Sequence, residues 1–411
     1  MTQIRTSRPR IGVDMHSVDG IHQGIRTHVL GLFSRVVEQG PDFQFVFFLD
    51  NPENLRAHSS FRAENVELVK MRHRSPALRL LAQLPTMARR QRLDLLHTQL
   101  VTPPYCPCPV AVTIHDTLFE SHPQFFSKMF ALRCRILARL SVRKSSLVCS
   151  VSEFSSREIG RFYGVKRETI VATANGADLS RFSPSNRHAD LDAKLGLNPK
   201  SYLLTVGRLE PRKNHIGLLR AYRTLKGPRP KLVIVGQRDF GYSGVYEFIR
   251  ANNLEEDVLI LEHVTDKVLP AIYNNALAFV FPSWAEGFGL PVLEAMASGI
   301  PVITSDSTAL AEIAGGAAIL VEPGDSDSMA RAMECVIASS EMRESLVEKG
   351  LKRARGFSWD APASRLLTSY RELFGMPEIP MTLAQAKLGC HMQEAQDSLR
   401  WGRASRISSS T

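Results

Sequence analysis

Buried strands alternate with helical segments along most of the chain, and this alternation constrains the fold more than any other feature. In the first half, strands are predicted at 11–17, 43–49, 93–99, 109–116, 145–152 and 169–176, with room for helices between them. The unbroken apolar run FQFVFFL at 43–49 is typical of a strand covered on both faces. Such an order predicts a parallel sheet packed between helices.

The pattern then restarts after a polar segment. Residues 183–200 have the composition of a linker, and strands are predicted at 202–207, 231–236, 257–264, 277–283, 301–306 and 317–323. The chain of 411 residues is too long for one ordinary core. We therefore expect an α/β protein with two doubly wound domains, at 1–190 and 191–360, facing each other across a cleft. A helix at 361–376 would return toward the first domain, and the tail at 377–411 is either loose or a short helix around 383–401.

The most informative stretch is FPSWAEGFGLPVLEAMASGIPVITSD at 281–306. A buried strand leads into a turn in which Gly289 permits close backbone approach, and Pro291 suits the first turn of the helix that follows. Glu286 then falls in the loop, and Glu294 lies one turn into the helix. A helix start offers unpaired N–H groups to an anion, and a carboxylate beside it can accept hydroxyl groups of a sugar.

A second candidate site follows another strand, in TVGRLEPRKNHIGLLRAY at 205–222. The strand ends at Gly207, and Arg208 and Lys213 fall in the loop before a helix whose N-cap is predicted to be Asn214. Two cations beside a helix start suit a diphosphate, because arginine offers a fork of donors and lysine a point charge. A solvated basic turn is the simpler alternative.

Two weaker features lie in the first half. Gly20 and Gly24 would let the loop SVDGIHQGIRTH at 17–28 approach a phosphate, although a plain turn has the same composition. His115 ends the strand PVAVTIHD, where a structural role is as compatible with the sequence as a catalytic one.

Several classes of protein lack their residues here. The sequence has no HExxH, GxSxG or P-loop motif and no acidic pair suited to a metal, so no metal site is expected. The spacing of Cys106 and Cys108 suits neither zinc nor a disulfide, and free thiols are expected. No apolar run reaches the ~18 residues that a membrane span needs, and the N-terminus does not resemble a secretory signal, so a cytoplasmic location is expected.

The motifs resemble those of a known enzyme family. GRLEPRKN (207–214) and EGFGLPVLEAMASGIPVITSD (286–306) look like the donor-binding motifs of the retaining glycosyltransferases of family 4, which have the GT-B fold. VSEFS (151–155), NGAD (175–178) and AAILVEPGD (317–325) are similar to the same family, and the resemblance covers about residues 10–375.

The resemblance implies that the C-terminal domain binds a nucleotide sugar and the N-terminal domain binds the acceptor, with no metal and no further cofactor. By motif, Arg208 and Lys213 would hold the leaving diphosphate, Glu286 the donor sugar and Glu294 the ribose. The family's other donor contacts fall on the backbone of Phe288, Gly289 and Leu290, on Gly207, on the loop at Gly24 and on His115 near the sugar. Retention would follow a front-face path in which the leaving phosphate accepts the acceptor's proton.

Charge is uneven along the chain. Residues 1–190 hold 26 Lys and Arg against 16 Asp and Glu, a net of +10, whereas residues 191–411 hold 25 of each. The basic half fits an anionic, lipid-linked or glycan acceptor, or peripheral contact with the inner face of the plasma membrane. The segment 122–146, with Arg135, Arg139 and Arg143 among apolar residues, is either an interfacial helix or an ordinary amphipathic helix packed on the sheet. The segment 76–96, interrupted by Pro85, is a weaker candidate.

Donor identity stays open at this level. The segments TIHD and STALAEIAG most resemble bacterial mannosyltransferases of surface polysaccharide assembly, which favours GDP-mannose, with a UDP-sugar as the alternative. A non-catalytic protein that binds polyanions or membranes is the rival class. Nucleic acid is not expected, because the basic stretches are mixed with Leu and Ile rather than with exposed aromatic residues.

Overall fold

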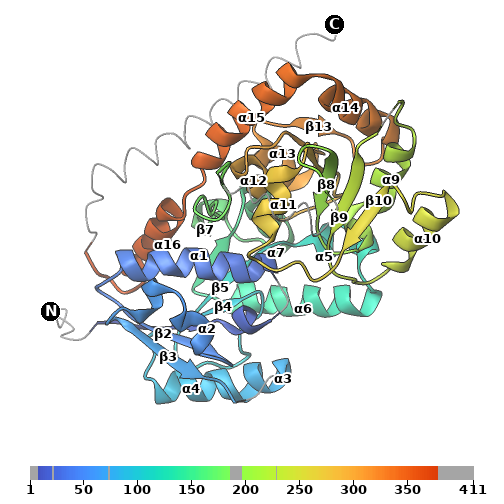
Figure 1. Ribbon diagram of the computed structural model, residues 1–411. Coiled ribbons are helices and arrows are strands. Elements are labelled where there is room, and N and C mark those ends of the chain that lie inside the picture. The colour runs from blue at the N-terminus through green and yellow to red at the C-terminus, as the bar shows by residue number, and fades with distance from the viewer. Residues whose placement is uncertain (1–7, 21–22, 73–74, 186–196, 228, 378–411) are drawn as a thin grey trace, which may run out of the picture. The chain divides into compact units, whose positions relative to one another are not determined.

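The computed structural model describes residues 8–20, 23–72, 75–185, 197–227 and 229–377 (Figure 1). The chain divides into two compact units, residues 1–176 with 358–411 and residues 177–357. Each unit contains one parallel sheet with helices on its faces. The helix considered at 383–401 lies outside the described residues.

The sheet of the first unit has seven strands in the order β3-β2-β1-β4-β5-β6-β7, and each described pairing is parallel. Its strands are β1 (Arg10–Asp14), β2 (Gln44–Leu49), β3 (Val66–Lys70), β4 (Leu95–Gln99), β5 (Val110–Ile114), β6 (Leu147–Ser150) and β7 (Ile170–Ala172). Sequence patterning missed β3, because this edge strand is only half-buried and lacks an unbroken apolar run.

Helices of the first unit connect these strands. They are η1 (His16–Asp19), α1 (Gln23–Gln39), α2 (Glu53–Arg56), η2 (Ser59–Arg62), α3 (Pro76–Leu78), a π-helical turn η3 (Arg79–Gln83), α4 (Leu84–Arg90), α5 (Leu118–Ser121), η4 (Pro123–Phe125), α6 (Lys128–Lys144), α7 (Glu153–Tyr163), η5 (Arg167–Thr169) and α16 (Asp360–Leu373). The segment 122–146 is therefore not one helix. Ser127 has extended backbone and caps α6 by accepting a hydrogen bond from the Phe130 N–H.

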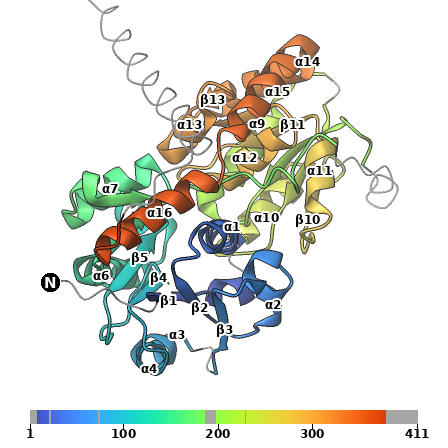
Figure 2. The same cartoon turned by 90° about the vertical axis from the view of Figure 1, so that its left-hand side faces the viewer.

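Side chains of β1 and β2 alternate between two cores. Ile11, Val13, Phe45 and Phe47 pack with α1 and α16, whereas Val46 and Phe48 pack with α4 on the other face. Helices α1 and α16 lie side by side in both views, although they come from opposite ends of the chain (Figures 1 and 2).

The sheet of the second unit has six strands in the order β10-β9-β8-β11-β12-β13, again with parallel pairings. The strands are β8 (Tyr202–Val206), β9 (Lys231–Val235), β10 (Val258–Leu261), β11 (Ala278–Phe281), β12 (Val302–Ser305) and β13 (Ile319–Val321). The helices are η6 (Pro211–Lys213), α9 (His215–Arg223), α10 (Ser243–Ala251), α11 (Leu269–Asn275), α12 (Leu290–Ala297), α13 (Thr308–Ala314), α14 (Ser326–Ala338) and α15 (Ser340–Arg355).

The order of each sheet reverses beside its first strand. β8 lies between β9 and β11, and β1 lies between β2 and β4. In doubly wound sheets a ligand binds beyond the carboxyl ends of the strands at such a reversal. In the second unit, this position is occupied by the loops that follow β8 and β11, which carry most of the predicted site.

Candidate active site

The loops after β8 and β11 are joined by a buried charge cluster. Lys213 Nζ donates to Glu286 Oε1 at 2.6 Å, and Arg212 Nη1 lies 2.9 Å from Glu286 Oε2. Ser283 Oγ donates to Glu286 Oε1 at 2.7 Å, and the Glu286 N–H donates to Thr308 Oγ1 at 3.0 Å. Glu286 is thus held from the β8 loop, from its own loop and from the start of α13, which fixes its position in the site.

The charges of this cluster are mutually dependent. Burial would raise the pKa of Glu286, but Arg212 and Lys213 outweigh it and lower the pKa to about 2. Burial lowers the pKa of Lys213, while Glu286 opposes that shift. Arg212 Nη2 also pairs with Glu210 Oε1, so two cations face two carboxylates and the charges of the cluster balance.

The start of α12 adds backbone donors to this region. Gly289 has a φ of +119° and occupies the N-cap position, and Pro291 lies in the first turn as predicted. Among the described residues, the N–H groups of Phe288, Gly289 and Leu290 meet no hydrogen-bond acceptor. They are available to an anion at the positive end of the helix. A Cβ at Gly289 would lie 2.7 Å from a methyl carbon of Leu310, so any other residue would be strained by this contact and by the positive φ.

Arg208 lies at the end of β8, where the backbone of two strands comes close together. A Cβ on Gly236 would lie 1.9 Å from the Gly207 carbonyl oxygen, so this approach requires glycine at 236. Arg208 Nη1 contacts Asp239 Oδ2 at 2.9 Å, and both side chains are half-buried. The predicted phosphate ligand is therefore already held by a carboxylate from the loop after β9.

Glu294 lies in α12, one turn from its start, as predicted. Tyr273 donates its hydroxyl to Glu294 Oε2 at 3.0 Å. Burial raises the pKa of Glu294 to about 7, against the opposing effects of Arg181 and the Tyr273 hydrogen bond. Its carboxyl is thus close to half-ionised near neutral pH.

Asn214 occupies the predicted N-cap position of α9, but its role differs from the prediction. Its φ is +59° and its side chain makes no capping hydrogen bond. The amide instead donates to the carbonyl oxygens of Pro282 at 3.1 Å and Pro323 at 2.7 Å. Asn214 therefore ties together the carboxyl ends of β11 and β13 rather than capping the helix.

His115 belongs to the first unit and follows β5. Its Nε2 lies 2.8 Å from Gln99 Oε1, an acceptor that places the ring proton on Nε2 and leaves Nδ1 with a lone pair. The ring packs edge-on against His28, whose Nδ1 lies 2.8 Å from Asn175 Oδ1. Burial and the neighbouring histidines hold the pKa of His115 well below its usual value, so the ring is neutral at pH 7.

Gly24 does not lie in a loop. It is in the first turn of α1, exposed, with no atom near the position of an added Cβ. The 17–28 segment becomes helical earlier than its glycines indicated, since η1 covers His16–Asp19 and α1 begins at Gln23. Conformational freedom at Gly24 is therefore not required by the backbone.

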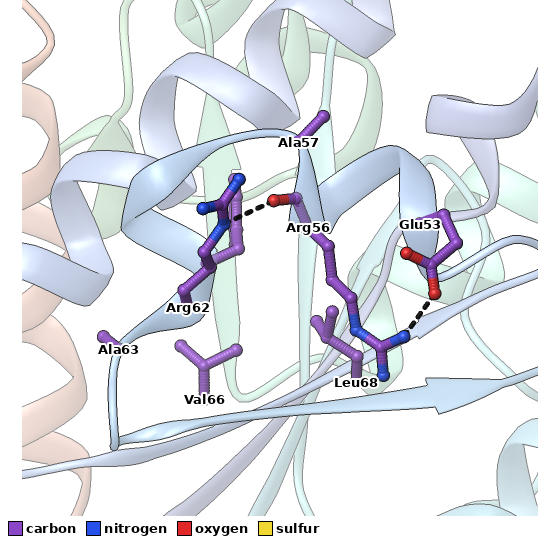
Figure 3. Close-up of a pocket in the computed structure, with 8 residues that line it drawn as sticks. Glu53, Arg56, Ala57, Arg62, Ala63, Val66 and Leu68 are labelled. Carbon is purple, nitrogen blue, oxygen red and sulfur yellow. Dashed lines mark hydrogen bonds and ion pairs between the residues drawn. The ribbon is translucent and has the colours of Figure 1, made fainter.

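A surface hollow of the first unit contains none of the predicted site residues (Figure 3). It is lined by Phe61, Val66, Leu68 and the ion-paired Glu53 and Arg56, and Arg62 Nε donates to the Arg56 carbonyl at 2.7 Å. In the described part of the chain, no three His, Cys, Asp or Glu side chains converge as a metal site requires.

Sequence reasoning missed several residues that contact the predicted ones, among them Arg212, Ser283 and Gln99. Arg212 and Ser283 bind Glu286, and Gln99 binds His115. Arg212 stands directly before Lys213 in the motif, so its charge was a visible signal. Nothing in the sequence marks Ser283 or Gln99, because their roles depend on how the loops fold.

Solved structures with the same fold define the class of the molecule. A sucrose-phosphate synthase from Thermosynechococcus elongatus matches with a TM-score of 0.72 at 20% identity, covering 90% of this chain and 100% of that one. Anabaena HepE, solved with UDP-glucose, matches with a TM-score of 0.71 at 18% identity, covering 88% and 99%. The chain therefore has the GT-B fold of glycosyltransferases.

Sequence comparison narrows the class to a family. The model for "Glycosyl transferases group 1" matches residues 188–353, and that for "Glycosyltransferase Family 4" matches residues 22–181. The O-antigen chain mannosyltransferase B of Escherichia coli is 32% identical over 266 residues, 64% of this chain and 70% of the relative. The O-antigen chain mannosyltransferase RfbU of Salmonella typhimurium (strain LT2) is 29% identical over 224 residues, 54% of this chain and 59% of the relative. The chain belongs to the group 1, family 4 glycosyltransferases.

Proposed function

We propose that this protein transfers mannose from GDP-mannose to a glycan or lipid-linked acceptor in polysaccharide assembly, with retention of configuration and without a metal ion. The observation that carries this proposal is the buried Lys213–Glu286–Arg212 cluster, together with the N–H groups at the start of α12 that have no acceptor among the described residues. A lysine held in place beside backbone N–H donors can stabilise a leaving diphosphate without a divalent cation, because these donors need no reorganisation as the bond between sugar and phosphate breaks.

Each residue has a distinct role in this proposal. Lys213 and Arg208 neutralise the leaving diphosphate, and the N–H groups of Phe288, Gly289 and Leu290 bind its oxygens. Glu286 orients Lys213 and contacts the donor sugar, and Glu294 accepts hydroxyl groups of the ribose. Gly207 lets the backbone at the end of β8 approach the donor, His115 offers a neutral ring to the sugar, and the segment at Gly24 closes on the donor. The leaving phosphate takes the acceptor's proton, because no described side chain is placed as an obvious nucleophile.

The choice of donor rests on the relatives. Both curated relatives named above are mannosyltransferases of O-antigen chains, which favours mannose and polysaccharide assembly. The structural match to a protein solved with UDP-glucose keeps a UDP-sugar as the second candidate.

Slow donor hydrolysis tests this proposal without knowledge of the acceptor. The full chain is incubated with GDP-mannose, UDP-glucose, ADP-glucose or dTDP-glucose in EDTA, nucleotide release is measured, and the first-formed anomer is read by NMR. We expect release of GDP alone and α-mannose as the first product. Lys213→Met should lower the rate by about 10²–10³-fold, whereas Lys349→Met, at an exposed position of α15, should leave it unchanged.

Each other outcome rejects a defined part of the proposal. Turnover of a UDP-sugar alone would reject GDP-mannose as the donor. β-Mannose as the first product would reject retention of configuration, and a requirement for added metal would reject metal-free catalysis. If the protein neither turns over nor binds any nucleotide sugar, the result would favour a non-catalytic polyanion-binding protein.

We further propose that α6 holds the protein against an anionic membrane on the cytoplasmic side. One side of α6 is buried: Ala131, Cys134 and Ala138 pack with Phe119 of α5, and Val142 packs with residues of β5 and β6. The other side exposes apolar residues, namely Met129 (78%), Phe130 (41%), Leu132 (54%), Ile136 (51%) and Leu140 (58%). The helix has basic residues and no acidic residue. Cations around an exposed apolar stripe match an anionic interface.

The three arginines of the candidate interfacial helix at 122–146 have different surroundings in the structure. Arg135 lies 3.1 Å from Glu120 and donates to the Phe119 carbonyl, so it is held within the unit. Arg139 donates to the Phe162 carbonyl at 3.4 Å, and Arg143 is exposed. In the described residues, no helix has the length and apolarity to cross a bilayer.

Vesicle sedimentation tests the membrane contact. Binding to phosphatidylglycerol vesicles should fall with salt and should be lost in the Ile136→Ser, Leu140→Ser double variant. Leu320→Ser, at an exposed apolar position of the second unit (42%), is the matched control and should bind as the wild type does. Equal sedimentation of the double variant and the control would refute the role of α6.

A further inference from the structure

The surface loop between β4 and β5 brings two thiols into contact. Cys106 Sγ and Cys108 Sγ are 3.6 Å apart, with only Pro107 between them in the chain. Both side chains are half-buried and pack against the core under α4, while the neighbouring Tyr105 is 60% exposed. The two thiols therefore pack on the core on one side and remain accessible to a small solute on the other.

A fixed cation lies beside this pair. Lys144, the last residue of α6, donates from Nζ to the carbonyl oxygens of Pro103 and Pro104, the former at 3.0 Å. These hydrogen bonds hold the ammonium group against the loop that carries the thiols. A cation held near a thiol favours the thiolate, which is the reactive form.

The two thiols have unequal acidities. The hydrogen bond with Cys108 lowers the pKa of Cys106 to about 7, against the effect of burial, and Lys144 lowers it further. The same hydrogen bond, burial and Asp94 raise the pKa of Cys108. Because Lys144 acts on Cys106 and Asp94 acts on Cys108, the surrounding charges favour the thiolate on Cys106.

We propose that Cys106 and Cys108 form a reversible redox site that exchanges with low-molecular-weight disulfides. The Cys106 thiolate attacks one sulfur of the disulfide, which gives a mixed disulfide and releases one thiolate. Cys108 then loses its proton to solvent and attacks Cys106 Sγ, which closes the Cys106–Cys108 disulfide and releases the second thiolate. The two electrons lost by the protein reduce the small disulfide to two thiols.

The geometry permits this closure and makes it easy to reverse. A disulfide bond is ~2.05 Å long, so the sulfur atoms must approach by about 1.5 Å, which side-chain rotation in an exposed loop can supply. Because the closed ring contains only one intervening residue, it is strained, and strained disulfides are readily reduced. This site is independent of the proposed transferase reaction.

Mass spectrometry of the full chain after exposure to oxidised glutathione tests the inference. The tryptic peptide 93–128 contains both thiols and no other cysteine. In the wild type this peptide should lose two hydrogen atoms and regain them with dithiothreitol. Cys108→Ser should instead accumulate a glutathione adduct on Cys106, because nothing resolves it, whereas Cys106→Ser should leave Cys108 largely unmodified.

Cys335, an exposed cysteine in a different peptide, is the internal control for oxidant access. Iodoacetamide labelling as a function of pH checks the acidities, with half-maximal labelling of Cys106 expected near pH 7. The inference is overturned if Cys335 takes up glutathione while peptide 93–128 stays reduced, or if the two serine variants behave alike. Melting temperatures of both variants establish that each is folded before labelling.

Discussion

Replacing Glu286 by glutamine should destabilise the second unit, because its carboxylate is ion-paired with the two buried cations Arg212 and Lys213. The pKa of Glu286 falls from 4.5 to about 2 in the folded protein. A difference of about 2.5 units corresponds to roughly 3 kcal/mol of stabilisation at neutral pH. Removing one partner from a buried ion pair typically costs about 3–5 kcal/mol, which agrees with that figure.

The expected shift in melting temperature follows from the size of the unit. For domains of about 150–250 residues, 1 kcal/mol shifts the melting temperature by about 2–4 °C. Differential scanning calorimetry of the full chain should therefore show the transition of the second unit about 10 °C lower in Glu286→Gln. Glu348→Gln, at an exposed position of α15 without a described partner, is the matched control and should shift it by less than about 2 °C.

The pH dependence provides a second check. Since the folded pKa is depressed, the stabilisation is fully present above pH 4.5 and is lost as the pH falls toward 2. The difference between Glu286→Gln and the wild type should therefore be constant from pH 6 to 8. A melting temperature of Glu286→Gln within the range of the Glu348→Gln control, or a difference that changes across that interval, would show that the Glu286 carboxylate does not stabilise the second unit.

Three other substitutions give independent outcomes. Gly289→Ala should destabilise the protein by about 1–3 kcal/mol in chemical denaturation, because φ is +119° and the new Cβ meets Leu310; Gly24→Ala, in an open helical position, should stabilise it by up to about 1 kcal/mol. Gln99→Leu should lower kcat for donor hydrolysis with little change in KM, because the hydrogen bond that fixes the tautomer of His115 is lost. An unchanged kcat would contradict a role of Gln99 in positioning the His115 ring. Glu294→Gln should raise the melting temperature more at pH 8 than at pH 5, because a raised folded pKa makes stability fall as pH rises from 4.5 through about 7.

Local patterns in the sequence predicted the framework of the site well. Pro291 and the glycines around it placed the start of α12, and with it the position of Glu294 within the first turns. The apolar runs predicted most strands of both sheets, because a strand that is buried on both faces consists almost entirely of apolar residues. The half-buried edge strand β3 carries no such signal and was missed.

Contacts between distant segments were not predictable in the same way. Lys213 and Glu286 were each identified, but their hydrogen bond spans 73 positions and depends on the adjacency of β8 and β11. Asn214 satisfied the rules for a helix cap, but its amide N–H groups donate to carbonyl oxygens at the ends of β11 and β13, and its side chain makes no capping hydrogen bond. In both cases the sequence identifies the residue, and the tertiary fold selects its partner.

Calorimetric titration of the full chain with GDP-mannose in EDTA measures donor binding and its dependence on Glu294 in one experiment. We expect metal-free binding to the wild type and at least tenfold weaker binding to Glu294→Gln, whose amide presents only one oxygen acceptor to the ribose hydroxyls. Absence of binding to the wild type without metal, or equal affinity in Glu294→Gln, would contradict the donor site described in the second unit.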